Sequence, residues 1–192
     1  MKKAVKEIRL VDMRALDEEV MSVEGYAAVF DTTTDLGWMK EVIDRHAFDN
    51  ADMSDIVMKY NHKDSVLPMA RTRGGTLQFT VDDHGLKIRA KLPDTSVNRD
   101  IYTLIREGVL SKMSFAFTVK SDEYDYDTDT RKILEFDKIF DVSVVDVPAY
   151  ETTEIYARSK EQYEEEKRQY EEKKNEYKLN LKKEKVKLLL SL

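Results

Sequence analysis

Three side chains far apart in the sequence have the types that acyl transfer by a serine nucleophile requires: Ser114, His62 and Asp141. Ser114 lies between Met113 and Phe115 in an apolar, strand-like segment, where a hydroxyl can be held rigidly. His62 follows a short apolar strand, and an imidazole exchanges protons near neutral pH. A serine nucleophile needs a base to accept its proton, and it benefits from an acid that orients this base. The three residues therefore form a candidate catalytic triad.

The acid of this candidate triad has two alternatives in one segment. Asp141 opens the β-branched and small run 142–145, so its carboxylate is expected near buried surface, and Asp146 at the end of that run is its rival. Structural roles also fit each residue alone. Ser114 can be an ordinary hydrogen-bonded strand serine, His62 a polar residue satisfied by backbone groups, and Asp141 a strand-end carboxylate in solvent.

Other candidate sites are weaker. The segment 122–129 has alternating aspartates with the early spacing of a calcium loop, but Thr130 stands where that loop requires glycine and Phe136 where it requires glutamate. Of the remaining histidines, His84 is expected in an exposed turn and His46 in a hydrogen-bonding role at the start of a helix. The chain has no cysteine and no phosphate-binding glycine loop. We therefore expect an acidic hairpin, and neither a metal nor an organic cofactor.

Hydrophobic patterning predicts an α+β fold around a mostly antiparallel, closed or nearly closed β-barrel with a few short helices. Short strands are expected at about 8–11, 23–30, 38–43, 56–60, 67–71, 75–81, 86–92, 115–119, 133–140 and 141–147. An amphipathic helix is expected from about Asn98 to Glu107, ending at Gly108, and a short helix at 45–50. The sequence from Asp82 to Gly85 predicts a hairpin turn, in which Gly85 can adopt a positive φ.

The composition changes from about residue 152, where Glu and Lys dominate and glycine and proline disappear. Tyrosines recur every seven residues at positions 163, 170 and 177, but lysines lie between them where a coiled-coil seam requires apolar side chains. We expect a catalytic domain at 1–157 and a charged, weakly coiled-coil-like helical tail at 158–192, which is long and exposed. Self-association or docking of this tail onto a partner is the alternative.

Charge and composition exclude several classes of partner. The chain has a net charge of −6; residues 158–192 hold 11 Lys/Arg and 8 Glu, a net charge of +3, which leaves −9 on the rest. An acidic body argues against binding to nucleic acid, because phosphate contacts need basic surface. No apolar run is long enough to span a membrane, and no secretory signal follows the first lysines. The sequence predicts a soluble cytoplasmic protein.

Several stretches resemble the prohead (capsid maturation) proteases of tailed bacteriophages, serine peptidases related in fold to herpesvirus assemblin. The resemblance covers about residues 7–157, and its order and spacing are more specific than any single piece. The matching stretches are Gly25-Tyr26-Ala27-Ala28-Val29-Phe30, Glu41-Val42-Ile43, Ala47-Phe48, Asn61-His62, Val66-Leu67, Leu92-Pro93-Asp94-Thr95-Ser96, Arg99-Asp100, Ile105-Arg106-Glu107-Gly108, Met113-Ser114-Phe115, Asp141-Val142-Ser143-Val144-Val145 and Pro148-Ala149.

The resemblance implies a serine endopeptidase with Ser114 as nucleophile, His62 as base and Asp141 as third member, at a position where the family usually has glutamate. It implies that the enzyme processes phage scaffold and major capsid proteins, and itself, inside the assembling procapsid in the bacterial host cytoplasm. A homodimer is compatible with this role, and the tail is expected to tether the enzyme to scaffold or portal, or to be a scaffold-like piece itself. A catalytically inactive virion assembly protein on the same fold, or a small β-domain binding module, are the alternatives.

Overall fold

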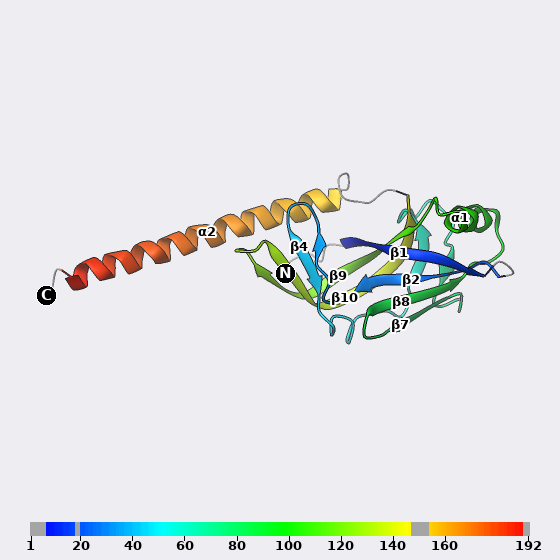
Figure 1. Cartoon of the computed structure of the whole chain (residues 1–192), viewed down its shortest axis with the longest axis horizontal. Helices are drawn as coiled ribbons and strands as arrows, with labels where there is room; N and C mark the ends of the chain where they lie inside the picture. Colours follow the sequence, from blue (N-terminus) through cyan, green and yellow to red (C-terminus); the bar gives the residue numbers. More distant parts are fainter. Residues whose placement is uncertain (1–6, 18–19, 147–153, 190–192) are drawn as a thin grey trace.

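The protein is an elongated, strand-rich body with a long helix that extends from one end (Figure 1). The structure, a computed structural model, describes residues 7–17, 20–146 and 154–189. In chain order the elements are β1 Glu7–Asp17, β2 Ser22–Val29, β3 Thr34–Asp35, β4 Lys40–Ile43, β5 Val57–Tyr60, β6 Ala70–Arg71, β7 Leu77–Val81, β8 Gly85–Lys91, α1 Ser96–Arg106, β9 Lys112–Asp125, β10 Thr130–Val145 and α2 Glu154–Leu189. Strands therefore dominate, as the patterning predicts.

The strands form one sheet in the order β3-β4-β10-β9-β1-β2-β8-β7; off this path, β5 pairs with β10 and β6 pairs with β5. Most neighbouring pairs are antiparallel, but β4 and β5 both run parallel to β10, one after the other along the same edge. Among the described residues no pairing joins β7 to β3 or β6, so the sheet is open. The prediction of a closed or nearly closed barrel is therefore wrong. Local alternation defines strands and their faces, but it does not define which edge strands meet.

Several predicted elements differ from those in the structure. The expected strands at 133–140 and 141–147 form one continuous strand, β10, whose described part ends at Val145. The short helix expected at 45–50 is a series of turns instead, in which the amides of Ala47, Asp49 and Ala51 each donate to the carbonyl three residues before. The strand expected at 67–71 is reduced to β6. Pro68, which lacks an amide hydrogen, shortens it.

The predicted amphipathic helix and hairpin turn are confirmed, but glycine is required at position 85 for a different reason from the one predicted. α1 is capped by Thr95, whose side chain accepts a hydrogen bond from the Asn98 amide, and Gly108 follows its end with φ 72°. Gly85 begins β8 after the predicted turn, yet it does not adopt a positive φ. It must be glycine because a Cβ there would lie 2.0 Å from the backbone oxygen of Ala28.

The core lies between the sheet, α1 and the turns before β5. Three phenylalanines anchor it: the rings of Phe115 and Phe117 stack at 4.7 Å, and Phe136 contacts Phe117 edge-on at 4.8 Å. All three are buried, and Met58 and Ile88 pack into the same cluster. This apolar face fixes β9 and β10 relative to each other, so polar side chains on the same two strands are also held in place.

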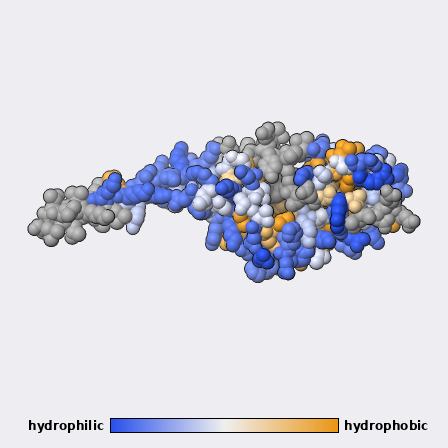
Figure 2. Space-filling view, viewed as in Figure 1, coloured by the Kyte–Doolittle hydropathy of each residue, from blue (hydrophilic) through white to orange (hydrophobic). Residues whose placement is uncertain are grey.

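α2 docks one end on the body and projects away from it (Figure 1). Tyr163 is buried against Leu36 and Met39, its ring lies 5.0 Å from that of Trp38, and its hydroxyl donates to Asp129 in the β9–β10 turn. Further along, Lys167 and Lys174 of α2 pair with aspartates of the same acidic turn. Tyr177, next in the seven-residue series, is exposed. The part of α2 from Tyr163 to Lys174 therefore contacts the body, and the described side chains beyond it are mostly hydrophilic (Figure 2).

Candidate active site

His62 is held in an unusual backbone conformation at the end of β5. Asn61 and His62 have φ angles of 52° and 55°, a left-handed conformation that costs non-glycine residues of order 1–3 kcal/mol each. The Asn61 amide donates to the backbone oxygen of Val144 at 2.8 Å, and its side-chain oxygen accepts from the Asp146 amide at 3.1 Å. These contacts to β10 hold the turn, and such strain is characteristic of functional sites.

This turn directs the His62 ring back along β10 toward Asp141. The parallel register pairs Asp141 with Val57 and Val144 with Tyr60, so His62 follows the far end of the paired segment. Nevertheless, its Nδ1 lies 2.5 Å from Asp141 Oδ1. The Asp141 side chain is fully buried, and Lys59 Nζ lies 3.8 Å from its second oxygen. Since an isolated buried charge is costly, this ammonium group partly balances the carboxylate.

Ser114 lies on the central strand β9, between β1 and β10. Its register partners are Leu10 on β1 and Ser143 on β10. Since side chains of directly paired residues lie on the same face, with Cβ atoms about 4.5–5.5 Å apart, Ser114 faces Ser143. Asp141 lies two residues before Ser143 and therefore on this face as well. The register thus places the candidate nucleophile beside the His62–Asp141 pair.

Two further atoms of the site are unpaired, so no hydrogen bond joins Ser114 to His62. Ser114 Oγ and His62 Nε2 are both buried, and neither has a hydrogen-bond partner. Buried polar atoms are rarely left unpaired, so each such atom needs an explanation. Because Nδ1 of His62 faces Asp141, Nε2 is the nitrogen that can accept a proton. The site therefore holds an unpaired hydroxyl, an unpaired ring nitrogen and a buried carboxylate, which are the parts of a serine acyl-transfer site.

The rival acid, Asp146, lies in a different position. It is exposed at the end of β10, where its carboxylate accepts a hydrogen bond from the Tyr60 hydroxyl at 3.0 Å. It lies five positions after Asp141, so regular alternation places the two side chains on opposite faces. The structure thus brings Asp141 to His62 and gives Asp146 a role in the turn that follows β5.

Two neighbours of the site were not identified from the sequence. Ser143 Oγ lies 3.0 Å from Asp141 Oδ1 and 3.1 Å from His62 Nδ1. Lys59 contacts both Asp141 and Asp64. The signal for Ser143 was its spacing, because the second residue after Asp141 in a strand shares its face. For Lys59 no local signal exists, since its contact depends on the parallel pairing of β5 with β10.

The remaining candidates lie outside this arrangement. His84 lies in the β7–β8 turn with its ring 4.5 Å from that of Tyr26, and exposed His46 lies 3.1 Å from Asp49. Within the described residues, no group of three or more His, Asp or Glu side chains could hold a metal ion. In the same part of the chain, no helix is long and apolar enough to cross a membrane.

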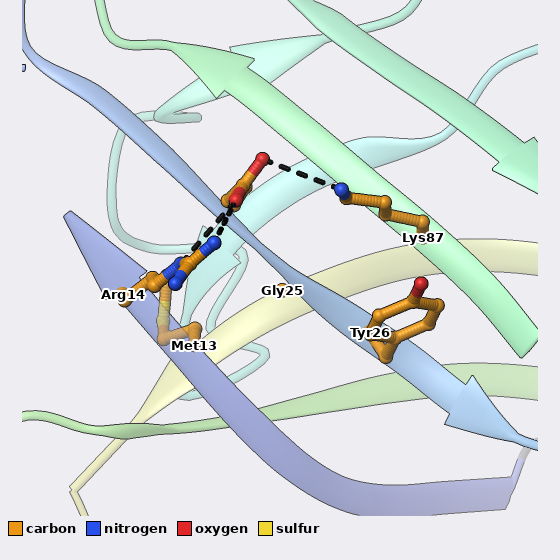
Figure 3. A pocket seen from close by; sticks show the side chains of 6 residues that line it. Met13, Arg14, Gly25, Tyr26 and Lys87 are labelled. Carbon is orange, nitrogen blue, oxygen red and sulfur yellow. Dashed lines mark hydrogen bonds and ion pairs between the residues drawn. The ribbon is translucent and has the colours of Figure 1, made fainter. Parts of the chain in front are cut away.

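A cavity of about 250 Å³ lies on β1, β2 and β8 (Figure 3). Its charged side chains neutralise one another: Arg14 and Lys87 lie 2.6 and 3.6 Å from the two oxygens of Glu24. The hydrogen bond from Arg14 lowers the pKa of Glu24, which keeps this carboxylate ionised. Neither Ser114 nor His62 lines this cavity, so it is not where the serine chemistry would occur.

Comparison with known proteins relates the chain to phage enzymes. A family model described as "Caudovirus prohead serine protease" matches residues 9–169. The prohead protease of Enterobacteria phage HK97 is 30% identical over 138 residues, which is 70% of this chain and 58% of the relative, so the chain spans little more than half of that protein. The solved structure of the bacteriophage T4 capsid assembly protease covers 74% of this chain and 99% of its own, with 11% identity and a TM-score of 0.48.

Proposed function

Because this chain belongs to the caudovirus prohead serine protease family, we propose that it is a serine endopeptidase that processes scaffold and capsid proteins, and itself, during procapsid maturation. The observation that supports this most strongly is the 2.5 Å contact between His62 Nδ1 and Asp141 Oδ1, next to an unpaired Ser114 hydroxyl. An ancestry shared with herpesvirus assemblin is part of the same proposal.

The proposed reaction is acyl transfer through Ser114. Its Oγ attacks the carbonyl carbon of the scissile peptide while His62 Nε2 accepts the hydroxyl proton. Asp141 holds the imidazole through Nδ1 and stabilises the positive charge that forms on it. The proton then passes to the leaving amine, and the acyl group stays on Ser114. A water molecule, deprotonated by the same imidazole, hydrolyses the ester and restores the serine. Neither a metal nor a cofactor takes part.

The substrates of the enzyme and the place where it acts are inferred from its family, as part of the same proposal. The enzyme acts inside the assembling procapsid, in the cytoplasm of the bacterial host, where scaffold and major capsid proteins are concentrated around it. The catalytic unit is residues 1–157, and the tail at 158–192 attaches it to scaffold or portal. This assignment of separate roles to the catalytic unit and the tail is supported by the docking of Tyr163 on the acidic turn, since this docking leaves the rest of α2 projecting from the body. A homodimer remains compatible with the arrangement.

Coexpression with the scaffold and capsid proteins of the same phage tests the proposal. The wild-type chain should shorten both substrates and itself, whereas Ser114→Ala should leave all of them at full length. Ser111→Ala is the matched control, because Ser111 is an exposed serine three residues away and should support normal processing. Equal processing by wild type and Ser114→Ala would eliminate the proposed nucleophile.

A second candidate function is a non-enzymatic assembly protein on the same fold. Burial favours it: the Ser114 side chain is 0% exposed, so a substrate carbonyl can reach Oγ only if neighbouring segments move. On this alternative, Ser114→Ala would assemble procapsids as well as the wild type and neither chain would cleave anything. Cleavage by the wild type alone distinguishes the two functions.

A further inference from the structure

Ser143 occupies the centre of the candidate site although it belongs to none of the three proposed catalytic roles. Its Oγ lies 3.0 Å from Asp141 Oδ1, 3.1 Å from His62 Nδ1 and 3.3 Å from the backbone nitrogen of His62. The side chain is 0% exposed, so these protein groups take the place of water around the hydroxyl. One hydroxyl thus contacts the acid, the base and the backbone that carries the base.

The single proton of this hydroxyl can be assigned from its neighbours. The backbone amide of His62 is a donor, so Ser143 Oγ accepts from it. In the tautomer required for catalysis, Nδ1 also carries a hydrogen, which is directed at Asp141. The Ser143 hydrogen therefore has one acceptor left, the carboxylate oxygen Oδ1 of Asp141. In this arrangement the Ser143 hydroxyl stabilises the state in which Asp141 is ionised and His62 Nδ1 carries its hydrogen.

The same assignment leaves Ser143 with no hydrogen to donate to Ser114. Ser143 is its direct register partner across β9 and β10. Ser143 donates to Asp141 instead, and Ser114 Oγ has no hydrogen-bond partner. Neither Ser143 nor His62 Nε2 is hydrogen-bonded to Ser114 Oγ in this structure.

We infer that Ser143 is a positioning residue that fixes the tautomer and orientation of His62 through Asp141. This inference rests on the proposed serine endopeptidase function and adds a fourth residue to its site. It gives Ser143 no contact with the substrate. It also connects the left-handed turn at His62 to the site, since the amide of this strained residue is bonded to the same hydroxyl that contacts its ring and its acid.

Ser143→Ala should lower kcat by about 10- to 100-fold, the effect of losing a hydrogen bond to a charged group, with little change in KM. The substrate is a peptide that spans a junction mapped in the processed scaffold protein. Ser22→Ala is the matched control, because Ser22 is a buried serine without a hydrogen-bond partner on a distant strand, and it should leave kcat unchanged. If Ser143→Ala does not fold, Ser143→Thr and Ser143→Val provide a pair of equal shape, of which only the threonine variant should retain activity.

A double-mutant cycle separates positioning from simple structural support. In an Asp141→Asn background, Ser143→Ala should cost less than 3-fold further, because the unit through which it acts is already broken. The downfield proton resonance expected from the short His62–Asp141 hydrogen bond should also shift in Ser143→Ala, whether or not a substrate is turned over. Fully additive losses with an unmoved resonance would overturn the inference. An inactive wild-type chain would refute the proposed function instead, and wild-type rates in Ser143→Ala would refute only the role of Ser143.

Discussion

Replacing each of the two rival acids by its amide provides the sharpest comparison on β10. Asp141→Asn removes a buried carboxylate 2.5 Å from His62 Nδ1, whereas Asp146→Asn alters an exposed carboxylate bonded to Tyr60. A charge-assisted hydrogen bond contributes about 1.5–3 kcal/mol, which corresponds to about 10- to 150-fold in rate. An asparagine amide can also donate to the ring and invert its tautomer, and a triad acid can then account for up to about 10⁴-fold in kcat. We therefore expect a loss of about 10²- to 10⁴-fold for Asp141→Asn.

The assay is the kcat/KM for a mapped cleavage peptide, together with the time course of self-processing. Asp146→Asn should change either rate by less than 3-fold. Folding of Asp141→Asn should be retained, because Lys59 keeps its second partner, Asp64, at 2.5 Å when the Asp141 charge is removed. Thermal unfolding of both variants is the control. An Asp146→Asn variant that is impaired as much as Asp141→Asn, or more, would refute the assignment of the acid.

Three further changes test the fold that carries the site. Glu41→Gln should lower the free energy of unfolding by about 3 kcal/mol, because it leaves the buried Arg131, 3.2 Å away, without one of its charged partners; urea unfolding measures this. Gly85→Ala should lower it by about 1–3 kcal/mol by the same assay, since the new Cβ meets a backbone oxygen at 2.0 Å, and unchanged stability would refute that contact. Hydrogen bonds from α2, chiefly that of its lysine, hold the pKa of Asp129 below its ordinary value of 3.8. This contribution to docking of α2 is therefore complete above that value and is lost as pH falls below it; Asp129→Asn should remove this pH dependence, as followed by the fluorescence of the single tryptophan, Trp38.

The sequence predicted what depends on local periodicity. The amphipathic stripe and Gly108 located α1 within two residues, and alternation located most strands. The closed barrel was wrong, because closure depends on which edge strands pair, and that is a property of distant segments. The continuity of β10 was missed for a related reason, since its two halves have different neighbours, β4 and β5.

The sequence likewise predicted only part of the candidate site. Residue types alone identified Ser114 and His62 as the candidate nucleophile and base, but they could not show whether Asp141 or Asp146 is the acid. That choice depends on the left-handed turn at Asn61 and His62, which directs the ring back along β10. The docking of α2 could not be derived either, because Tyr163, which packs against the body, belongs to the same seven-residue series as the exposed Tyr177.

The identity of the nucleophile is tested most directly by mapping a fluorophosphonate adduct. The full chain is treated with the probe, digested, and the labelled peptide is sequenced by mass spectrometry. We predict one adduct, on Ser114, that is absent in Ser114→Ala and reduced at least 100-fold in rate in His62→Gln. No adduct on an otherwise folded wild-type chain, or an adduct on Ser143 in place of Ser114, would contradict the proposed catalytic site.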